Sequence, residues 1–353
     1  MSLIETNQLL LFENITKYKT FSINNRRYLG NKYHLLPFIK NVIDKECKNI
    51  KSVADIFSGT GSFASAYTDK ILTTNDLLYC NYISHCAWFY PKKYNREKVI
   101  SSISEYNSLN IKEDNYMTEN FANTYFSFND CSKIGYIRED IEKKFKEGKY
   151  SFRERALLIT SLIYAMDKIA NTCGHYDAYR KVDNFDVSLE LAVPLATITN
   201  NKQNRCFNLD ANELVVNLYS DLIYIDPPYN SRQYCDSYHL LENVALWQKP
   251  KVFGVAKKMD RTNLKSDYST KNAPKKFADL IDKINARYIL LSYNNMANKG
   301  NERSNAKISD EDILSILSKK GNVKMFSEDY KSFSAGKSDI KDNKERLFLC
   351  ECK

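Results

Sequence analysis

The feature that most constrains the fold is a short apolar run that leads directly into a glycine turn. The segment from Val53 to Phe57 has the composition of a buried strand, and Ser58-Gly59-Thr60-Gly61-Ser62 follows it. A residue without a Cβ lets the backbone approach a ligand while the chain reverses into a helix. A second short strand, Ile71 to Thr74, ends at Asn75-Asp76. Strand, glycine turn, helix, strand and terminal acid are typical of one half of an open nucleotide-binding α/β sheet.

Two carboxylates flank this turn. Asp55 lies on the strand before it, where a carboxylate suits a cationic group, such as an α-amine or a sulfonium, better than a pyrophosphate. This position favours S-adenosylmethionine over NAD as the ligand. Asp76 ends the second strand and can accept both hydroxyls of a ribose. Asp is also a favoured helix N-cap, so both interpretations of Asp76 stay open.

Another apolar strand, expected at Leu222 to Ile225, ends in Asp226-Pro227-Pro228-Tyr229. The prolines stop the strand and hold the backbone rigid. A carboxylate, a carbonyl group and an aromatic ring are therefore presented in fixed geometry at the edge of the sheet. The alternative is a strand that merely ends in a proline-rich turn, and the strand context favours a functional site.

The remaining sequence separates into a part with a strand pattern and a part with a helical pattern. Charged helices, expected over 138–147 and 152–171, replace the sheet pattern between residues 95 and 203, which predicts an inserted helical domain. The sheet domain is expected to occupy 20–94 and 204–353. Near its end, residues 323–326 and 347–350 are predicted to pair as antiparallel strands.

Composition narrows the class of protein. Of 353 residues, 43% are hydrophobic and 27% charged, which is ordinary globular composition. The apolar runs are too short to cross a bilayer and the first residues lack a signal-peptide pattern, so we expect a cytoplasmic protein that does not enter a membrane. Nine cysteines without a Cys-x-x-Cys pair and four scattered histidines predict no metal site. The net charge of +9 fits a polyanionic partner, although a modest lysine excess on a balanced surface gives the same value.

The order of these parts resembles the Dam-type (alpha-class) adenine-specific DNA methyltransferases, particularly those that accompany restriction endonucleases. The parts are the Tyr28-Leu-Gly-Asn-Lys32 loop, the glycine turn, Asp76, the helical insert, Asp210-Ala211 and Asp226-Pro-Pro-Tyr229. The resemblance implies a Rossmann-like S-adenosylmethionine-dependent methyltransferase fold. It also implies that the insert is the target-recognition domain.

The resemblance further implies roles for individual residues. Tyr28 and Lys32 occupy the family's N-terminal cofactor-contacting loop, with Tyr28 where many members carry Trp and Gly30-Asn31 where Gly-Gly is commonest. Asp226 would line both the cofactor site and the target-base pocket, and Tyr229 would line that pocket. The remaining cofactor contacts implied are Asp55, Phe57, Gly59 and Gly61 to methionine and adenosine, Asp76 to ribose, and Asp210 to adenine.

The chemistry of adenine explains these residue types. Its exocyclic amine is a poor nucleophile because the nitrogen lone pair is conjugated with the ring. The Asp226 carboxylate and the Pro227 carbonyl can accept its two hydrogens and favour in-line attack on a sulfonium methyl group. Tyr229 can stack on the base, which must first leave the duplex. Cytosine carbon-5 chemistry would require a Pro-Cys nucleophile, and the sequence has no Pro-Cys dipeptide.

Several basic residues are candidates for contact with DNA. Arg232 could hold a phosphate near the flipped nucleotide or form a surface salt bridge. A basic stretch that includes Lys257, Lys258 and Arg261 could follow a DNA backbone or be a solvated loop. In the insert, base-reading side chains are expected among Arg153, Arg155, Lys168, Arg180 and Lys181, beside Tyr164, Tyr176 and Tyr179.

The sequence thus predicts a site-specific enzyme that transfers a methyl group from S-adenosylmethionine to the N6 amine of a flipped adenine in duplex DNA. It would act as a monomer and protect host DNA in a restriction-modification system, with any endonuclease on a separate chain. The alternatives are an adenine-N6 RNA methyltransferase or a protein glutamine methyltransferase, which usually carry Asn at the position of Asp226, and a non-catalytic DNA-binding protein.

Overall fold

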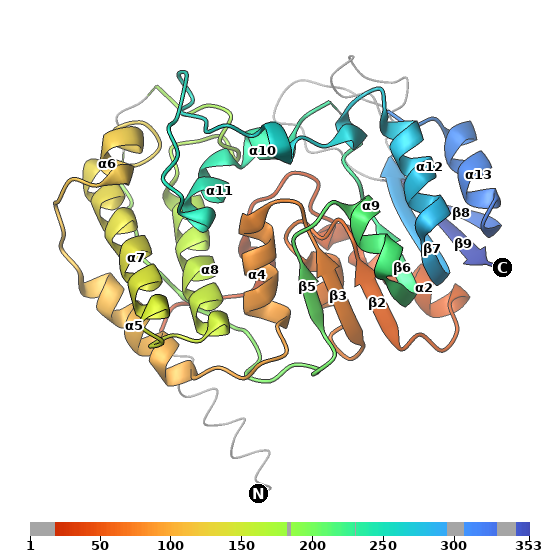
Figure 1. Ribbon diagram of the computed structural model, residues 1–353, viewed down its shortest axis with the longest axis horizontal. Helices are drawn as coiled ribbons and strands as arrows, with labels where there is room; N and C mark the ends of the chain where they lie inside the picture. The colour runs from red at the N-terminus through yellow and green to blue at the C-terminus, as the bar shows by residue number, and fades with distance from the viewer. Residues whose placement is uncertain (1–17, 182–184, 230, 295–306, 330–343) are drawn as a thin grey trace, which may run out of the picture. The chain divides into compact units, whose positions relative to one another are not determined.

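The computed structural model describes residues 18–181, 185–229, 231–294, 307–329 and 344–353 (Figure 1). The chain divides into two compact units. The sheet unit comprises Gly30–Tyr82, Asn201–His239 and Arg261–Lys353. The helical unit comprises Met1–Leu29, Ile83–Asn200 and Leu240–Asp260. It therefore includes most of the range 95–203 and two further segments of the chain.

Within the described residues, the sheet unit is built on seven strands in the order β5-β3-β2-β6-β7-β9-β8. The first five run parallel, and β9 is antiparallel to β7 and β8. In the order of the sheet, the strands are Arg205–Phe207, Ile71–Asn75, Ser52–Asp55, Tyr219–Ile225, Asn285–Asn294, Lys344–Cys352 and Gly321–Asp329. This mostly parallel sheet confirms the α/β prediction and is consistent with a methyltransferase fold. The expected antiparallel pair near the end of the chain is also confirmed.

The strand order reverses between β2 and β6. From β2 the sheet continues to β3 and β5, and from β6 it continues to β7. The two central strands are in register, with Asp55 opposite Tyr224. In open parallel sheets, ligands bind outside the carboxyl ends of the strands at such a reversal. The glycine turn and Asp226, which follow β2 and β6, therefore lie where the fold favours a ligand site.

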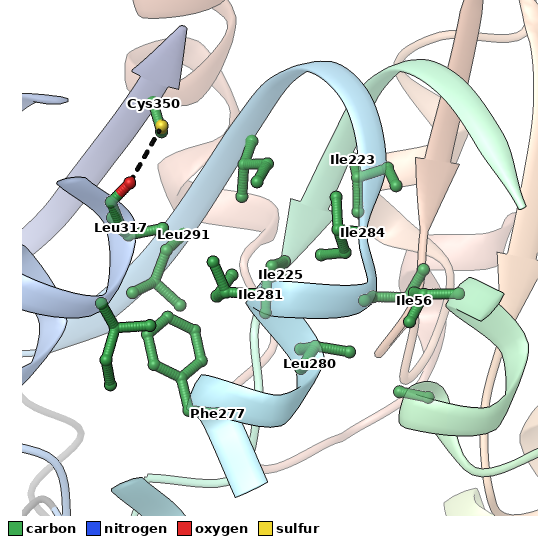
Figure 2. Packing of buried hydrophobic residues seen from close by; sticks show 14 of the residues in the cluster. Ile56, Ile223, Ile225, Phe277, Leu280, Ile281, Ile284, Leu291, Leu317 and Cys350 are labelled. Carbon is green, nitrogen blue, oxygen red and sulfur yellow. Dashed lines mark hydrogen bonds between the residues drawn. The ribbon is translucent and has the colours of Figure 1, made fainter. Parts of the chain in front are cut away.

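One face of the sheet packs against α9 (Ala211–Leu214), α12 (Ala273–Lys283) and α13 (Asp310–Ser318) (Figure 1). Figure 2 shows Ile225 of β6 close to Ile281 of α12 and Ile223 close to Ile284, and these side chains are fully or almost fully buried. Burial of each large aliphatic side chain contributes roughly 1.5–3 kcal/mol. This packing holds rigid the strands that lead to the glycine turn and to Asp226.

Alternate residues of β6 point to the opposite face. There Phe63, in α3 (Ser62–Ser65), stacks on Tyr224 with ring centroids 3.9 Å apart. The helix α2 (Leu36–Glu46), with a proline in its first turn, buries Ile39, Val42 and Ile43. Short helical turns are Ile23–Asn25, Tyr33–Leu35, Val215–Asn217, Thr262–Leu264 and Asp267–Ser269.

The helical unit contains α5 (Arg96–Ser108), α6 (Tyr116–Phe121), α7 (Phe128–Lys146) and α8 (Phe152–Ile169). Helix α8 begins with a capping box of Ser151 and Glu154 and matches the expected range closely. Helix α7 begins at Phe128, well before the expected position, because Cys131, Ile134 and Ile137 extend its buried face toward the N-terminus. The remaining elements are β1 (Thr20–Phe21) paired with β4 (Val193–Pro194), α4 (Tyr79–Phe89), α10 (Tyr234–Ser237) and α11 (His239–Leu246).

Two arginines of the helical unit correct the sequence prediction. Arg153 is 1% exposed, and its guanidinium donates to the carbonyls of Lys92, Thr197 and Ile198 at 2.8, 2.6 and 2.9 Å. Arg155 is also buried, and its Nε donates to the Glu142 carboxylate at 2.9 Å. Guanidinium groups that brace the interior cannot reach a base edge, so their assignment as base-reading candidates was wrong. Lys168, Arg180 and Lys181 are exposed.

No helix in the described part of the chain is both long enough and apolar enough to cross a membrane.

Candidate active site

The edge of the sheet at the strand reversal is held together by Asn75, the last residue of β3. Its side-chain amide donates to the carbonyls of Ile56 and Leu209 at 3.0 and 3.1 Å, and its Oδ1 accepts from the Leu209 amide at 3.0 Å. These bonds join the loops that follow β2, β3 and β5. Because Asn75 is buried, each bond is shielded from competing water.

The glycine turn has the backbone that the sequence predicts. Gly59 and Gly61 have φ values of +53° and +85°, in the region that favours glycine. The Gly59 amide donates to Asp76 Oδ2 at 2.8 Å, and the Leu78 amide donates to Asp76 Oδ1 at 2.9 Å. Asp76 thus holds the glycine turn and closes a short turn that ends just before α4 (Tyr79–Phe89). A contact with ribose at this carboxylate stays a prediction.

Asp55 is a buried carboxylate with an unsatisfied atom. Asp55 is 2% exposed, and its Oδ1 has no hydrogen-bond partner among the described residues. Burial, reinforced by the nearby charges of Asp226 and Asp76, holds the pKa of Asp55 well above its ordinary value. A positively charged ligand group beside Oδ1 would relieve this cost.

The loop before α2 contacts the glycine turn. Asn31 Oδ1 accepts from Ser62 Oγ at 3.0 Å and from the Tyr33 amide at 2.9 Å. Gly30 has a φ of +75°, and a Cβ there would lie 2.9 Å from the Tyr234 hydroxyl. The loop can therefore pass this close to Tyr234 only with glycine at position 30. Tyr28 belongs to the helical unit, where the Arg26 guanidinium lies 5.4 Å from its ring centroid.

Lys32 lies between two carboxylates. Its Nζ is 3.0 Å from Asp226 Oδ1 and 3.1 Å from Glu345 Oε1. The ammonium also lies 5.3 Å from the centroid of the Tyr229 ring. Burial by itself lowers the pKa of Lys32, but the two carboxylates outweigh it and hold that pKa well above its ordinary value. Lys32 is therefore charged at any pH at which the protein would work.

Asp226 has an unusually high affinity for a proton. Burial raises its pKa, Lys32 lowers it and Glu345 raises it again, which leaves the pKa at about 6. Its side chain is 16% exposed, so the group is still reachable. Within the described part of the chain, Asp226 is paired through Oδ1, which leaves Oδ2 for an incoming donor.

Pro227 and Tyr229 complete this part of the site. Pro227 is buried at the end of the strand. The Tyr229 ring meets the Tyr293 ring edge-to-face, with centroids 6.0 Å apart and planes at 75°. The Tyr293 hydroxyl in turn accepts from the amides of Lys307 and Ile308 at 3.2 and 3.1 Å. The position of the Tyr229 ring beside Asp226 is thus fixed by its contact with a second, anchored ring.

Phe57 and Asp210 lie near the carboxyl ends of β2 and β5. The Phe57 ring packs edge-to-face on Tyr268 at 5.1 Å. Asp210 caps α9, because its Oδ1 accepts from the Asn212 amide at 2.9 Å, and Lys276 Nζ lies 3.6 Å from the same oxygen. Both residues lie on the edge expected for a cofactor, and their contacts with it stay predictions.

The four basic residues expected at DNA are divided between the two units. Arg232 and Arg261 belong to the sheet unit, where Arg232 is exposed and Arg261 Nε lies 2.7 Å from Asp236 Oδ1. Lys257 and Lys258 belong to the helical unit, in a tight turn closed by the pairing of Phe253 with Lys258. Lys258 Nζ lies 3.0 Å from Asp177 Oδ1. Contacts of these residues with DNA stay predictions.

Sequence reasoning missed Glu345 and Asn75. Glu345 is buried at the start of β9, where Ser292 Oγ of β7 donates to its Oε1 at 2.8 Å. A signal was present in the sequence, since Glu345 shortly precedes the apolar run Leu347-Phe348-Leu349, and Asn75 precedes Asp76 at a strand end. A polar residue at the end of a buried strand at this edge of the sheet is a candidate for the site.

The Lys32 loop, the glycine turn and Asp226 lie at one edge of the sheet. A family model of the D12 class N6 adenine-specific DNA methyltransferases matches residues 28–305. The chain belongs to this family. The match spans most of the sheet unit, including the Lys32 loop, the glycine turn and Asp226, and it confirms the family inferred from the sequence.

Curated relatives agree with the family. Modification methylase StsI of Streptococcus sanguinis is 37% identical over 309 residues, which are 82% of this chain and 46% of that protein. Type II methyltransferase M.FokI of Planomicrobium okeanokoites is 33% identical over 319 residues, covering 84% and 47% of the two chains. This D12-class chain thus spans about half the length of these two relatives. It covers 95% of type II methyltransferase M.NlaIII of Neisseria lactamica, at 27% identity over 335 residues, or 90% of this chain.

Proposed function

We propose that this D12-class chain transfers a methyl group from S-adenosylmethionine to the N6 amine of adenine in duplex DNA. The observation that carries the proposal is the pairing of Asp226 with Lys32 through a single carboxylate oxygen at the strand reversal. This arrangement leaves a reachable acceptor beside the Tyr229 ring. We further propose that the reaction protects host DNA in a restriction-modification system, within the cytoplasm, and that any cognate endonuclease is a separate chain.

The residues at the edge of the sheet fit the proposed cofactor. Asp55 would hold a cationic group, because its buried Oδ1 has no hydrogen-bond partner among the described residues. Gly59 and Gly61 let the backbone approach the ligand closely, and Phe57, Asp76 and Asp210 would surround its adenosine part. When bound, S-adenosylmethionine supplies an electrophilic methyl group and leaves as a neutral thioether.

The protein's part in the reaction is to orient and activate the amine. Asp226 Oδ2 and the Pro227 carbonyl would accept its two hydrogens, which localises the nitrogen lone pair for attack. The nitrogen must lose one proton when it gains the methyl group. Asp226, with a pKa of about 6, can take that proton near neutral pH and pass it to water.

DNA binding would use both units of the chain. A base leaves the duplex before its amine can reach Asp226, and the Tyr229 ring offers a stacking surface for it. We propose that Arg232, Lys257, Lys258 and Arg261 contact phosphates, and that the helical unit reads the target sequence. We also propose that one copy of the chain acts on each site.

A labelled methyl group tests the proposal. Purified protein is incubated with tritiated S-adenosylmethionine and duplex DNA that lacks prior methylation, with matched single-stranded RNA in parallel. Nucleosides from each reaction are then separated by chromatography. We expect label in N6-methyldeoxyadenosine. Label confined to RNA or to protein would contradict the proposal and indicate an RNA methyltransferase or a protein methyltransferase instead.

A further inference from the structure

Three neighbouring strands bring two carboxylates to the same edge of the sheet unit. Asp226 follows β6, and β7 lies between β6 and β9. Because β9 is antiparallel to β7, the start of β9 lies beside the end of β7, with Glu345 opposite Asn294. The β-sheet hydrogen bonds thus place Glu345 close to the Asp226 loop, although the two are far apart in the sequence.

Glu345 is held on both sides. Its Oε1 accepts from Ser292 Oγ at 2.8 Å and lies 3.1 Å from Lys32 Nζ. The Glu345 side chain is 5% exposed and that of Lys32 is 7% exposed. Buried charges persist in folded proteins when they are paired and hydrogen-bonded. Lys32 therefore has two fixed anionic partners, one on a strand and one on a strand-end loop.

We propose that Glu345 is a positioning residue for the proposed methyl transfer, which holds the Lys32 ammonium at Oδ1 of Asp226 and so directs Oδ2 toward the target amine. The inference rests on the proposed function. Glu345 acts through Lys32 and does not contact the substrate.

Geometry explains why a second carboxylate is needed. A lysine ammonium is a point charge on a flexible stem of four methylene groups, and with one carboxylate it can sit at either oxygen. Glu345 lies on β9, which pairs with β7 on one side and β8 on the other, and its carboxylate accepts from Ser292, so it restricts the position of Nζ. When the carboxylate is already oriented, binding of the amine carries a smaller entropic cost.

The charge of Glu345 also affects the pKa of Asp226. The titratable or charged groups that act on Asp226 are Lys32, Glu345 and Asp55, together with the hydroxyls of Tyr224 and Tyr234. Glu345 raises the pKa of Asp226 and opposes Lys32, which lowers it. Without Glu345 the full charge of Lys32 acts on Asp226, so the Asp226 pKa falls and the carboxylate becomes a weaker acceptor.

The test compares Glu345→Gln with Glu351→Gln in the full chain. Both residues lie on β9, but Glu351 is exposed and serves as the matched control. Glu345→Asp, which keeps the charge, serves as the rescue variant. Circular dichroism identifies the temperatures at which each variant is folded, and all measurements are made below them. Asp226 titration is followed by 13C NMR of labelled carboxyl groups, with the signal assigned by its loss in Asp226→Asn.

We expect Glu345→Gln to shift both the Asp226 titration and the acidic limb of the kcat profile to lower pH, by about one pH unit. We expect kcat to fall roughly 10-fold or more, with KM for S-adenosylmethionine changed less than about threefold. Glu345→Asp should restore the limb toward its wild-type position. Glu351→Gln should change neither quantity.

An unchanged Asp226 titration in folded Glu345→Gln, or an equal shift in Glu351→Gln, would overturn the inference. If Glu345→Gln does not fold, Ser292→Ala replaces it, and a kcat in Ser292→Ala equal to that of the wild type would count against the proposal. If the wild-type chain methylates no DNA, the proposed function fails by itself, and the NMR titration still decides whether Glu345 controls Asp226.

Discussion

Lys32 and Asp226 form a largely buried ion pair, with Nζ and Oδ1 3.0 Å apart, although one precedes the first strand of the sheet and the other follows a central one. The pair joins the loop before α2 to the end of β6. It leaves one side of the Asp226 carboxylate for a ligand. The proposed chemistry depends on this relationship.

Replacement of Lys32 by Met should destabilise the protein by about 3–5 kcal/mol, because two carboxylates lose their shared cation. Without the ammonium, the folded-state pKa of Asp226 rises further above that of an ordinary Asp. A carboxylate with a raised folded-state pKa stabilises the protein less as the pH rises. Urea unfolding should therefore show a larger loss of free energy at about pH 8 than at about pH 5. Equal losses at the two pH values would contradict the ion-pair assignment.

Asp55→Asn should separate cofactor binding from folding. Removal of the charge should weaken binding of S-adenosylmethionine by about 10- to 100-fold, measured by calorimetry. The same change should raise the free energy of unfolding, more at pH 8 than at pH 4, because burial penalises the ionised form of Asp55. Asp69→Asn, at an exposed position near the start of β3, is the control and should change neither. Unchanged affinity in Asp55→Asn would remove Asp55 from the cofactor site.

Gly30→Ala should impair the site beyond the cost of backbone strain. Gly30 and Gly148 have φ values of +75° and +71°, but a Cβ at position 148 meets nothing within 4 Å. Alanine at either position should cost roughly 1 kcal/mol from strain. At position 30 it should also displace Tyr234 or the Lys32 loop and reduce cofactor affinity. Similar affinity for S-adenosylmethionine in the two variants would show that the close approach of Gly30 to Tyr234 is not needed for cofactor binding.

Arg232→Ala should weaken DNA binding equally for all sequences. The exposed guanidinium is proposed to contact a phosphate, so its loss should reduce the slope of log K against log salt by about 0.9. Lys319→Ala, at an exposed position after α13, provides the comparison. A sequence-dependent loss would instead assign Arg232 to base recognition.

Much of the fold could be predicted from the sequence because its signals are local. The apolar runs before Gly59 and before Asp226 became β2 and β6, and the expected helix at 152–171 became α8. Glycine and proline acted as reliable boundaries, since each restricts the backbone in a known way. The family also followed from the order of these segments.

The details of the site required contacts between distant segments. Glu345 reaches Lys32 through the strand order β6-β7-β9, which no local pattern encodes. Arg153 resembled a surface residue in sequence, but its burial depends on carbonyls from two loops far from it in the chain. Asp76 was open to two interpretations, and the structure shows that its carboxylate accepts the Gly59 and Leu78 amides without excluding contact with a ligand. In each case the tertiary partner determines what the residue does.

Methyl transfer by Asp226→Ala tests most directly whether Asp226 acts on the target amine. Lys32 would keep Glu345 as its partner in this variant, so the buried ammonium stays paired and the fold should survive. Affinities for S-adenosylmethionine and for DNA are measured beside the single-turnover rate of N6-methyladenine formation. We expect both affinities to change little while the rate falls by about 10²–10³-fold or more. A rate equal to that of the wild-type chain would contradict the assignment of Asp226 as the residue that acts on the amine.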